Sequence, residues 1–285
     1  MIQYLYLGRV GYDEGLRLQA EIAELRHQGR VENVLLLLEH PAVLTLGRNA
    51  HRSNVLASDE LLARRGVAIH EINRGGDVTY HGPGQLVGYP IFDLRSLHNA
   101  TGGRMGPVDF VRGMEEALIR VCGVYGVRAG RIKGLTGVWC GVTPPGSSEG
   151  PAVLRPEAKV CAIGIHVSRG ITSHGFAFNV TTDLRDFTLI VPCGIADHPV
   201  TSLEREMAQL AELPGLEAVA HQTARLFGQV FDQQVLAAES LDALRAQAAA
   251  AQPFPAPAFP AQDTPLQVPA QVQRLHSPGE RPVRA

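Results

Sequence analysis

The sequence predicts an α/β (α+β) domain with a mixed, largely antiparallel sheet that is flanked by helices. Two observations carry this prediction. Apolar stretches of strand length follow one another in neighbouring runs, without a helix after each of them. Between these runs stand longer segments with apolar residues three or four positions apart and charged residues on the opposite face. The chain of 285 residues is long enough for one large domain.

The individual elements are predicted from apolar spacing and from flanking residues. Leu18, Ile22 and Leu25 share one helical face, and the continuous apolar run at 34–38 has the length of a buried strand. Helices are expected at 12–27, 58–65, around 111–121, from 202 and around 216–230. Strands are expected at 34–38, 43–46, 67–72, 86–92, 160–167 and 176–180.

Two further patterns refine this order. In the strand at 160–167, Cys161 and Ile163 would share one face, and Val160 and Ala162 the other. Thr201 with Glu204 forms a capping-box pattern that predicts a helix opening at Ser202.

Composition excludes several classes of function. Apolar residues make up 45% of the chain and charged residues 19%, and the formal net charge is −2. This charge provides no general basic surface for nucleic acid or an anionic membrane. The longest aliphatic stretch, at 34–38, is far shorter than the roughly 18 residues of a membrane span. Because no basic leader precedes an apolar core at the N-terminus, we expect a cytoplasmic protein.

Two segments are expected to lie outside the folded core. Residues 143–157 are rich in proline, glycine and serine, which predicts a flexible surface loop. The last 35 residues hold eight of the 19 prolines, and alanine and glutamine are frequent there. We therefore predict a folded domain over 1–240 and a disordered Pro/Ala-rich tail over 241–285.

A glycine-rich segment at 74–85 is the first candidate site. Four glycines and a proline in twelve residues bring backbone close to another group, and Arg74, Thr79, His81 and Gln85 add hydrogen-bonding side chains. A tight turn with solvated polar groups would account for the same composition. The segment has neither the lysine of a phosphate-binding loop nor the spacing of a dinucleotide fingerprint.

Cys193 and Lys159 are the second and third candidates. Cys193 stands between Pro192 and Gly194, a turn that could present a thiol beside a free backbone N–H. Lys159 precedes the strand at 160–167, and an ammonium group close to a thiol stabilises the thiolate. A buried small apolar cysteine and a solvated lysine are the ordinary alternatives for these residue types.

The remaining cysteines and histidines give weaker signals. Cys122, Cys140 and Cys161 fall in apolar patterns and are expected in the core. His81 and His174 each stand beside a glycine and could be ligands or bases. No cysteine pair or ligand spacing supports a metal site.

Together these segments resemble the lipoyl(octanoyl) transferase family. The glycine motif of that family matches residues 74–85, and Tyr89 completes it. Its lysine strand matches 159–164, its His-Gly segment matches 174–180, and its Pro-Cys-Gly active site matches 192–194. The order and the 34-residue interval between Lys159 and Cys193 also agree, and the resemblance covers roughly residues 1–232. The loop at 143–157 is longer than is usual in the family.

The resemblance implies a fold like the catalytic domain of biotin and lipoate protein ligases, with residues 1–240 as an octanoyltransferase catalytic domain. The implied reaction moves an octanoyl group from acyl carrier protein to a lysine of a lipoyl domain, the first step of endogenous protein lipoylation. The implied partners are octanoyl-acyl carrier protein, the lipoyl domains of 2-oxoacid dehydrogenase complexes and the glycine cleavage H protein. Neither ATP nor a metal is implied as cofactor, because the donor arrives as a thioester, and a monomer is expected.

The resemblance also implies roles for individual residues. Cys193 would attack the octanoyl thioester after activation by Lys159, which would later take the proton of the target lysine. His174 would be auxiliary. The implied substrate contacts are Arg74, Gly75, Gly76, Asp77, Val78, Thr79, Tyr80, His81, Ala162, Ile163, Gly164, Gly175, Phe176 and Ala177.

Three other functions stay open at this point. An ATP-dependent lipoate or biotin ligase shares the implied fold but needs no cysteine nucleophile. A non-catalytic protein that binds acyl carriers or lipoyl domains would keep an apolar slot without a Lys-Cys pair. A cysteine hydrolase would pair His81 with Cys193 and use water as the acceptor.

Overall fold

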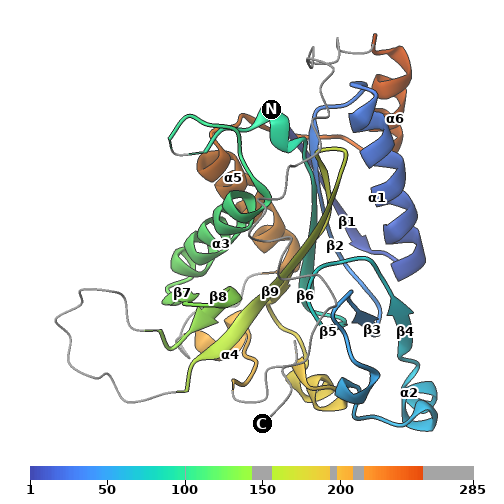
Figure 1. Ribbon diagram of the computed structural model, residues 1–285, viewed down its shortest axis with the longest axis vertical. Helices are drawn as coiled ribbons and strands as arrows, with labels where there is room; N and C mark the ends of the chain where they lie inside the picture. Colours follow the sequence, from blue (N-terminus) through green and yellow to red (C-terminus); the bar gives the residue numbers. More distant parts are fainter. Residues whose placement is uncertain (100, 143–155, 193–197, 208–214, 253–285) are drawn as a thin grey trace, which may run out of the picture. The chain divides into compact units, whose positions relative to one another are not determined.

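The structure is built around an eight-stranded mixed sheet (Figure 1). This computed structural model describes residues 1–99, 101–142, 156–192, 198–207 and 215–252. The strand order is β11-β1-β2-β6-β10-β9-β8-β7, in which β1 runs parallel to β2 and β11 and all other neighbours are antiparallel. The strands are β1 (Ile2–Arg9), β2 (Asn33–Glu39), β6 (Gln85–Ile91), β7 (Ala129–Ile132), β8 (Leu135–Cys140), β9 (Ala158–Ser168), β10 (Ile171–Asn179) and β11 (Val235–Ala237).

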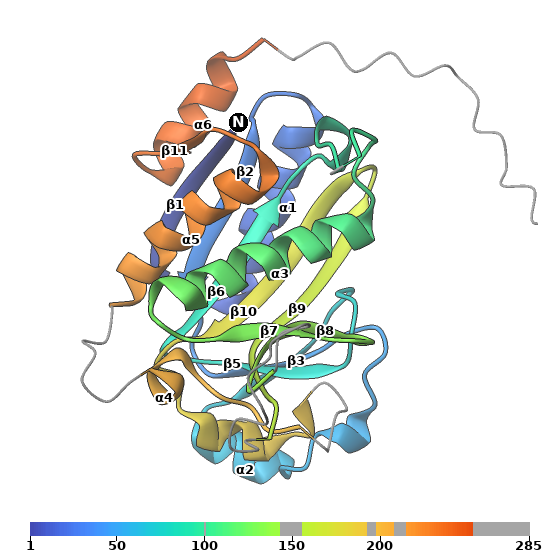
Figure 2. The same cartoon turned by 90° about the vertical axis from the view of Figure 1, so that its left-hand side faces the viewer.

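Helices cover both faces of this sheet (Figures 1 and 2). The helices α3 (Pro107–Val124) and α5 (Leu216–Phe231) pack on one face and bury the larger apolar cluster. The helices α1 (Tyr12–His27) and α6 (Leu241–Ala250) pack on the other face over a second cluster. The predicted mixed, largely antiparallel sheet with flanking helices is therefore confirmed.

A three-stranded sheet lies beside the large one, in the order β4 (Ala68–Glu71), β3 (Val43–Leu46), β5 (Val78–His81). It has its own apolar cluster with the helix α2 (Asp59–Arg65). The Ser58 hydroxyl caps α2 by accepting from Leu61 N, and Gly66 ends it with a φ of 64°. Short 3₁₀ helices span Arg52–Asn54, Leu94–Ser96 and Leu184–Leu189.

The sequence pattern missed several elements. The strands β1, β7, β8 and β11 were not predicted, and β5 lies inside the segment expected to be a turn. The helix α4 (Leu203–Glu206) begins one residue later than expected, because its cap is Ser202 and not Thr201: the Ser202 hydroxyl accepts from Arg205 N at 3.2 Å. Thr201 and Ser202 stand side by side and either hydroxyl could cap a helix, which made this boundary ambiguous.

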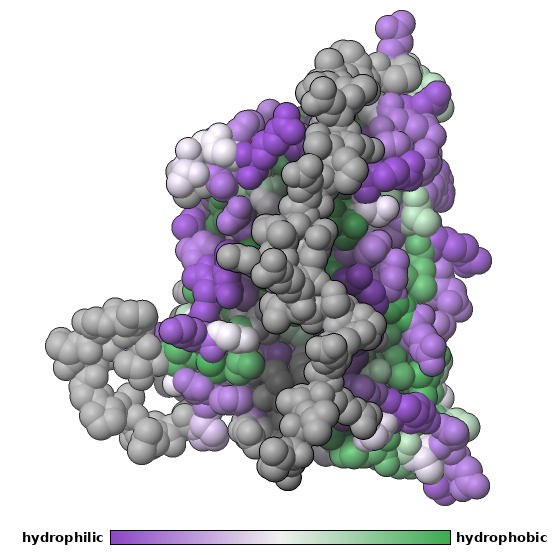
Figure 3. Space-filling model, viewed as in Figure 1, coloured by the Kyte–Doolittle hydropathy of each residue, from purple (hydrophilic) through white to green (hydrophobic). Residues whose placement is uncertain are grey.

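Figure 3 shows hydrophilic residues spread over the visible face between smaller hydrophobic areas. Within the described ranges, we find no helix with the length and apolar character needed to span a bilayer. Of the loop predicted at 143–157, residues 143–155 lie outside the described part of the chain.

The prediction of disorder from residue 241 onward is wrong for its first ten residues, which form α6. The Ser240 hydroxyl caps this helix by accepting from Ala243 N at 3.0 Å. Leu244 and Ala248 are each only 1% exposed, and Arg245 forms an ion pair with Glu21 of α1. The rest of the predicted tail, from 253, lies outside the described residues.

Removing α6 should therefore destabilise the domain. A chain that ends at Gln252 should keep the free energy of unfolding of the full protein, whereas one that ends at Glu239 should lose about 2–4 kcal/mol through the exposure of apolar surface. Urea unfolding of the two truncated chains checks this expectation. Equal stability of the two would show that α6 adds nothing to the fold.

Candidate active site

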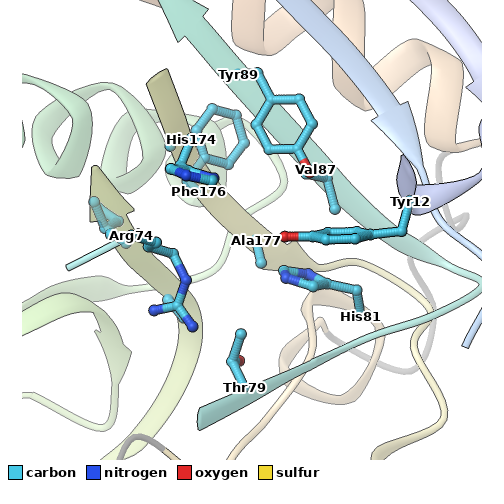
Figure 4. A pocket seen from close by; sticks show the side chains of 13 residues that line it. Tyr12, Arg74, Thr79, His81, Val87, Tyr89, His174, Phe176 and Ala177 are labelled. Atoms are coloured by element: carbon cyan, nitrogen blue, oxygen red, sulfur yellow. The ribbon is translucent and has the colours of Figure 1, made fainter. Parts of the chain in front are cut away.

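A pocket lies between the large sheet and the small one, and Tyr12 at the start of α1 forms part of its wall (Figure 4). It encloses about 340 Å³ outside the atoms, part of which is open solvent. Ten predicted site residues line it, and three further residues join them. The predicted ones are Arg74, Thr79, His81, Ala162, Ile163, Gly164, His174, Gly175, Phe176 and Ala177, and the others are Tyr12, Val87 and Tyr89.

Two rows of small residues lie along the sheet side of this pocket. Ala162 on β9 is paired with Ala177 on β10, and Gly164 is paired with Gly175. A Cβ atom on Gly164 would lie 2.6 Å from Gly75 O, so only glycine lets the glycine-rich segment cross β9 this closely. These small residues leave room on the pocket face of β9 and β10, which suits an unbranched apolar chain.

Arg74 fixes the glycine-rich turn from inside. Its guanidinium donates to the backbone oxygens of Gly75 and Asp77 at 2.8 Å and also reaches Thr45 O at 3.3 Å. Gly76 follows with a φ of 92°, in the left-handed region that glycine adopts without strain. The turn is therefore shaped largely by its own arginine.

The other predicted residues of this segment do not line the pocket. Along β5 the side chains alternate, so Thr79 and His81 face the pocket while Val78 and Tyr80 point into the apolar cluster of the small sheet. The Tyr80 hydroxyl donates to Asp186. Gly75, Gly76 and Asp77 shape the turn outside the pocket lining.

Hydrogen bonds fix the tautomer of His81. Gln85 Nε2 donates to Tyr80 O at 3.0 Å, so its Oε1 faces His81 and accepts from Nδ1 at 2.8 Å. Nε2 of the ring then carries no proton. Burial, assisted by His40, lowers the pKa of His81 to about 3. His81 is therefore a weak base, which does not favour a His81–Cys193 hydrolase dyad.

Two more histidines around the pocket are neutral. His40 Nδ1 donates to Val10 O, and its Nε2 accepts from the Tyr89 hydroxyl, both at 2.7 Å. Burial lowers the pKa of His40 to about 4. Burial, then the charge of Arg74, lowers the pKa of His174 to about 4 as well. These histidines are thus neutral at pH 7, and Arg74 is the charged side chain in the lining of the pocket.

These histidines should make the fold sensitive to acid. Their folded-state pKa values lie below the unfolded value near 6.5, so the unfolded chain binds more protons as the pH falls from 6.5 towards 4. Stability is full above pH 6.5, and each such histidine should cost about 2 kcal/mol between pH 7 and pH 5. Urea unfolding against pH should show a shallower slope for His40→Gln, whereas His221→Gln, an exposed histidine, should keep the wild-type slope. An unchanged slope in His40→Gln would contradict this assignment.

A β-bulge in β9 sets the direction of the Lys159 side chain. Val138 of β8 pairs with Cys161, but the next residue, Trp139, pairs with Lys159, so Val160 is an extra residue in β9. Val160 and Cys161 both enter the core under α3, which corrects the strict alternation predicted for this strand. Lys159 therefore points to the opposite face, the one on which Ala162 lines the pocket.

Lys159 is held in a defined place although it does not line the pocket itself. It is 7% exposed, and its Nζ lies 4.6 Å from the centroid of the Trp139 ring. Its backbone N–H donates to Pro199 O and its carbonyl accepts from Thr201 N, both at 2.9 Å. The segment that follows Cys193 in the chain is thereby fastened to Lys159.

Cys193 itself lies outside the described residues, but the chain on its N-terminal side is also anchored. Val191 N donates to Asn54 O at 2.7 Å, and Asn54 Nδ2 donates to Asp77 Oδ2 at 2.6 Å. The residues on the two sides of Cys193 are thus attached to the glycine-rich segment and to Lys159.

The described cysteines are poor nucleophiles. Cys122, Cys140 and Cys161 are buried, as predicted, and burial raises the pKa of Cys140 to about 12 and that of the other two as well. If the chain uses a thiolate, Cys193 is the residue that can supply it. In the described ranges, we find no cluster of His, Cys, Asp and Glu side chains that could bind a metal ion.

Of the three additional pocket residues, only Tyr89 carried a signal in the sequence. Tyr89 was part of the family motif, but Tyr12 is simply the first residue of an amphipathic helix and Val87 an apolar strand residue. Their positions follow from packing between α1 and β6. No local pattern marks such contacts.

Comparisons with known proteins agree with this geometry. A model of the lipoyl protein ligase A/B catalytic domain matches residues 11–226. The fold is similar to that of a bipartite lipoate protein ligase from Thermoplasma acidophilum, with a TM-score of 0.62 at 17% identity over 87% of this chain and 91% of that one. The fold and the pocket thus define a catalytic domain of the lipoate ligase and transferase type.

More similar sequences narrow this class. An octanoyltransferase of Acidobacterium capsulatum is 61% identical over 84% of this chain and 94% of that protein. An octanoyltransferase of Koribacter versatilis is 49% identical over 97% of each chain. The chain belongs to the lipoyl protein ligase A/B catalytic domain family and, within it, to the octanoyltransferases.

Proposed function

We propose that the protein transfers an octanoyl or lipoyl group from acyl carrier protein to a lysine of a lipoyl domain, through a thioester on Cys193. The observation that carries this proposal is the small-residue pocket, whose lining residue Ala162 lies on the same face of β9 as Lys159. The Lys159 backbone is also hydrogen-bonded to Pro199 and Thr201, which follow Cys193 in the chain. The octanoyltransferase relatives support the same reaction class. The acceptors would be lipoyl domains of 2-oxoacid dehydrogenase complexes and the glycine cleavage H protein, and the site of action the cytoplasm.

The proposed chemistry has two balanced steps. Lys159 takes the proton of the Cys193 thiol, and the thiolate attacks the acyl carbonyl. The tetrahedral oxyanion collapses, the carrier's phosphopantetheine thiolate leaves, and Lys159 gives the proton to it and becomes neutral. The target lysine amine then attacks the acyl-Cys193 thioester. The Cys193 thiolate leaves, the amide forms, and Lys159 accepts the proton that the amine loses.

Neither ATP nor a metal enters these steps, because a thioester is already activated. The apolar rows Ala162–Ala177 and Gly164–Gly175 would hold the acyl chain, and Arg74, Thr79 and His81 would line its side. His174 is assigned to the wall of the pocket and not to proton transfer, since it is neutral and a weak base. We propose a monomer as the active form.

The test is octanoylation of a purified apo lipoyl domain, followed by mass spectrometry. With octanoyl-acyl carrier protein and no ATP, we expect the octanoyl mass on the target lysine. Octanoylation that requires free octanoate and ATP would identify an ATP-dependent ligase instead. Release of free octanoate without labelling of the domain would identify a hydrolase.

A further inference from the structure

His174 separates the pocket of the active site from a second cavity. His174 lines both, and it is 5% exposed. The outer cavity encloses about 740 Å³ outside the atoms, part of it open solvent. Apolar side chains of α1 and of the chain after β4 contribute to its lining, namely Leu16, Ala20, Ala23 and Ile72. This cavity could therefore accept the end of an alkyl chain if the partition were removed.

The partition is fixed on both sides of the histidine. His174 has a φ of 56°, a left-handed conformation that is uncommon for a residue with a side chain. Its backbone N–H donates to Gln19 Oε1, and its Nε2 lies 2.7 Å from Asn73 Oδ1. Gln19 and Asn73 both belong to the outer cavity. The ring is thus held across the space between the cavities.

The partition stands at a distance that matches an eight-carbon chain. Ala162 is the lining residue of β9 nearest in the chain to Lys159, and we take it as the carbonyl end of the site. His174 is paired with Ile165, three residues further along β9, which is about 10 Å at the rise of a strand. An extended octanoyl chain with seven C–C bonds spans about 9 Å. In Figure 4, His174 lies across the pocket from Thr79 and beside Phe176.

We propose that His174 is the specificity-determining end wall of the acyl site, and that it limits the chain to about eight carbons. A longer chain would have to displace the ring from Gln19 and Asn73. The identity of the chain as an acyl group rests on the proposed function. The existence of a partition that excludes longer alkyl chains does not depend on that function.

The test compares octanoyl and dodecanoyl chains in the full protein. His174→Gly removes the ring and suits the positive φ, and His174→Asn keeps a smaller polar side chain that tolerates this conformation. Leu16→Ala is the control, since it enlarges the outer cavity and leaves the partition in place. Equimolar octanoyl- and dodecanoyl-acyl carrier protein are offered, and the enzyme adducts are compared by intact mass. Thermal shifts with free octanoate and dodecanoate give a readout that needs no chemistry.

Wild type and Leu16→Ala should prefer the shorter chain in both readouts. His174→Gly should raise the ratio of dodecanoyl to octanoyl at least about tenfold, because four more methylenes gain a buried site, and His174→Asn should raise it less. An unchanged ratio in a folded His174→Gly protein would overturn the proposal. If wild type forms no adduct but the thermal shifts with free fatty acids change as expected in His174→Gly, the transfer reaction would be refuted. The role of His174 as the end wall would still stand. If His174→Gly does not fold, the ratio in His174→Asn decides the question.

Discussion

Replacing Cys193 with alanine should lower acyl transfer to lipoyl domains by at least about a thousandfold, since removal of a covalent nucleophile generally costs this much or more. The described cysteines cannot take its place, because burial raises the pKa of each of their thiols. The measurement is the single-turnover rate of octanoyl transfer from the carrier to a lipoyl domain.

Two controls accompany this variant. The circular dichroism spectrum and the urea midpoint of Cys193→Ala should match those of wild type, which excludes unfolding as the cause. Cys122→Ala changes a buried cysteine in α3, and it should lose stability but little activity per folded molecule. A Cys193→Ala protein with more than a tenth of wild-type activity would refute a thioester on this residue.

Replacing Lys159 with methionine should lower the rate of transfer about 10²- to 10⁴-fold, the usual contribution of a positioned acid or base. Methionine keeps an unbranched stem against the Trp139 ring, so the loss would come from the missing amine. Pre-steady-state measurement of enzyme acylation and of transfer to the lipoyl domain gives the two rates separately.

Lys159→Arg distinguishes the two roles assigned to this residue. Arginine stays charged at all accessible pH values, so it can stabilise the Cys193 thiolate but cannot accept a proton. Acylation of the enzyme should therefore be partly restored relative to Lys159→Met, while transfer to the lipoyl lysine stays slow. Equal restoration of both steps would argue against Lys159 as the proton acceptor.

Much of the site was predictable because its residues belong to local segments. Glycine and other small residues indicate a close backbone approach in three segments: the turn at 74–81, the strand after Lys159 and the segment after His174. Their meeting in one pocket follows from the pairing of β9 with β10 and from the packing of β5 beside them. Among the residues predicted at 74–81, strand alternation turns the side chains of Val78 and Tyr80 into the apolar cluster of the small sheet, and they do not line the pocket.

Other features depend on contacts that no local pattern reveals. Val160 and Cys161 are both apolar, so the bulge that points Lys159 away from the core leaves no trace in the alternation. The helix α6 is short and rich in alanine, and only its packing against α1 distinguishes it from a linker. Tyr12 likewise enters the pocket wall through the docking of α1. In each case tertiary packing decides what local composition leaves open.

A thioester on Cys193 is tested by the intact mass of the protein after mixing with octanoyl-acyl carrier protein in the absence of ATP. We expect an octanoyl adduct that hydroxylamine removes, that passes to an apo lipoyl domain and that does not form on Cys193→Ser under the same conditions. Octanoylation of the lipoyl domain without any adduct on the wild-type enzyme would contradict a thioester on Cys193. Octanoylation by Cys193→Ser at the wild-type rate would contradict it as well.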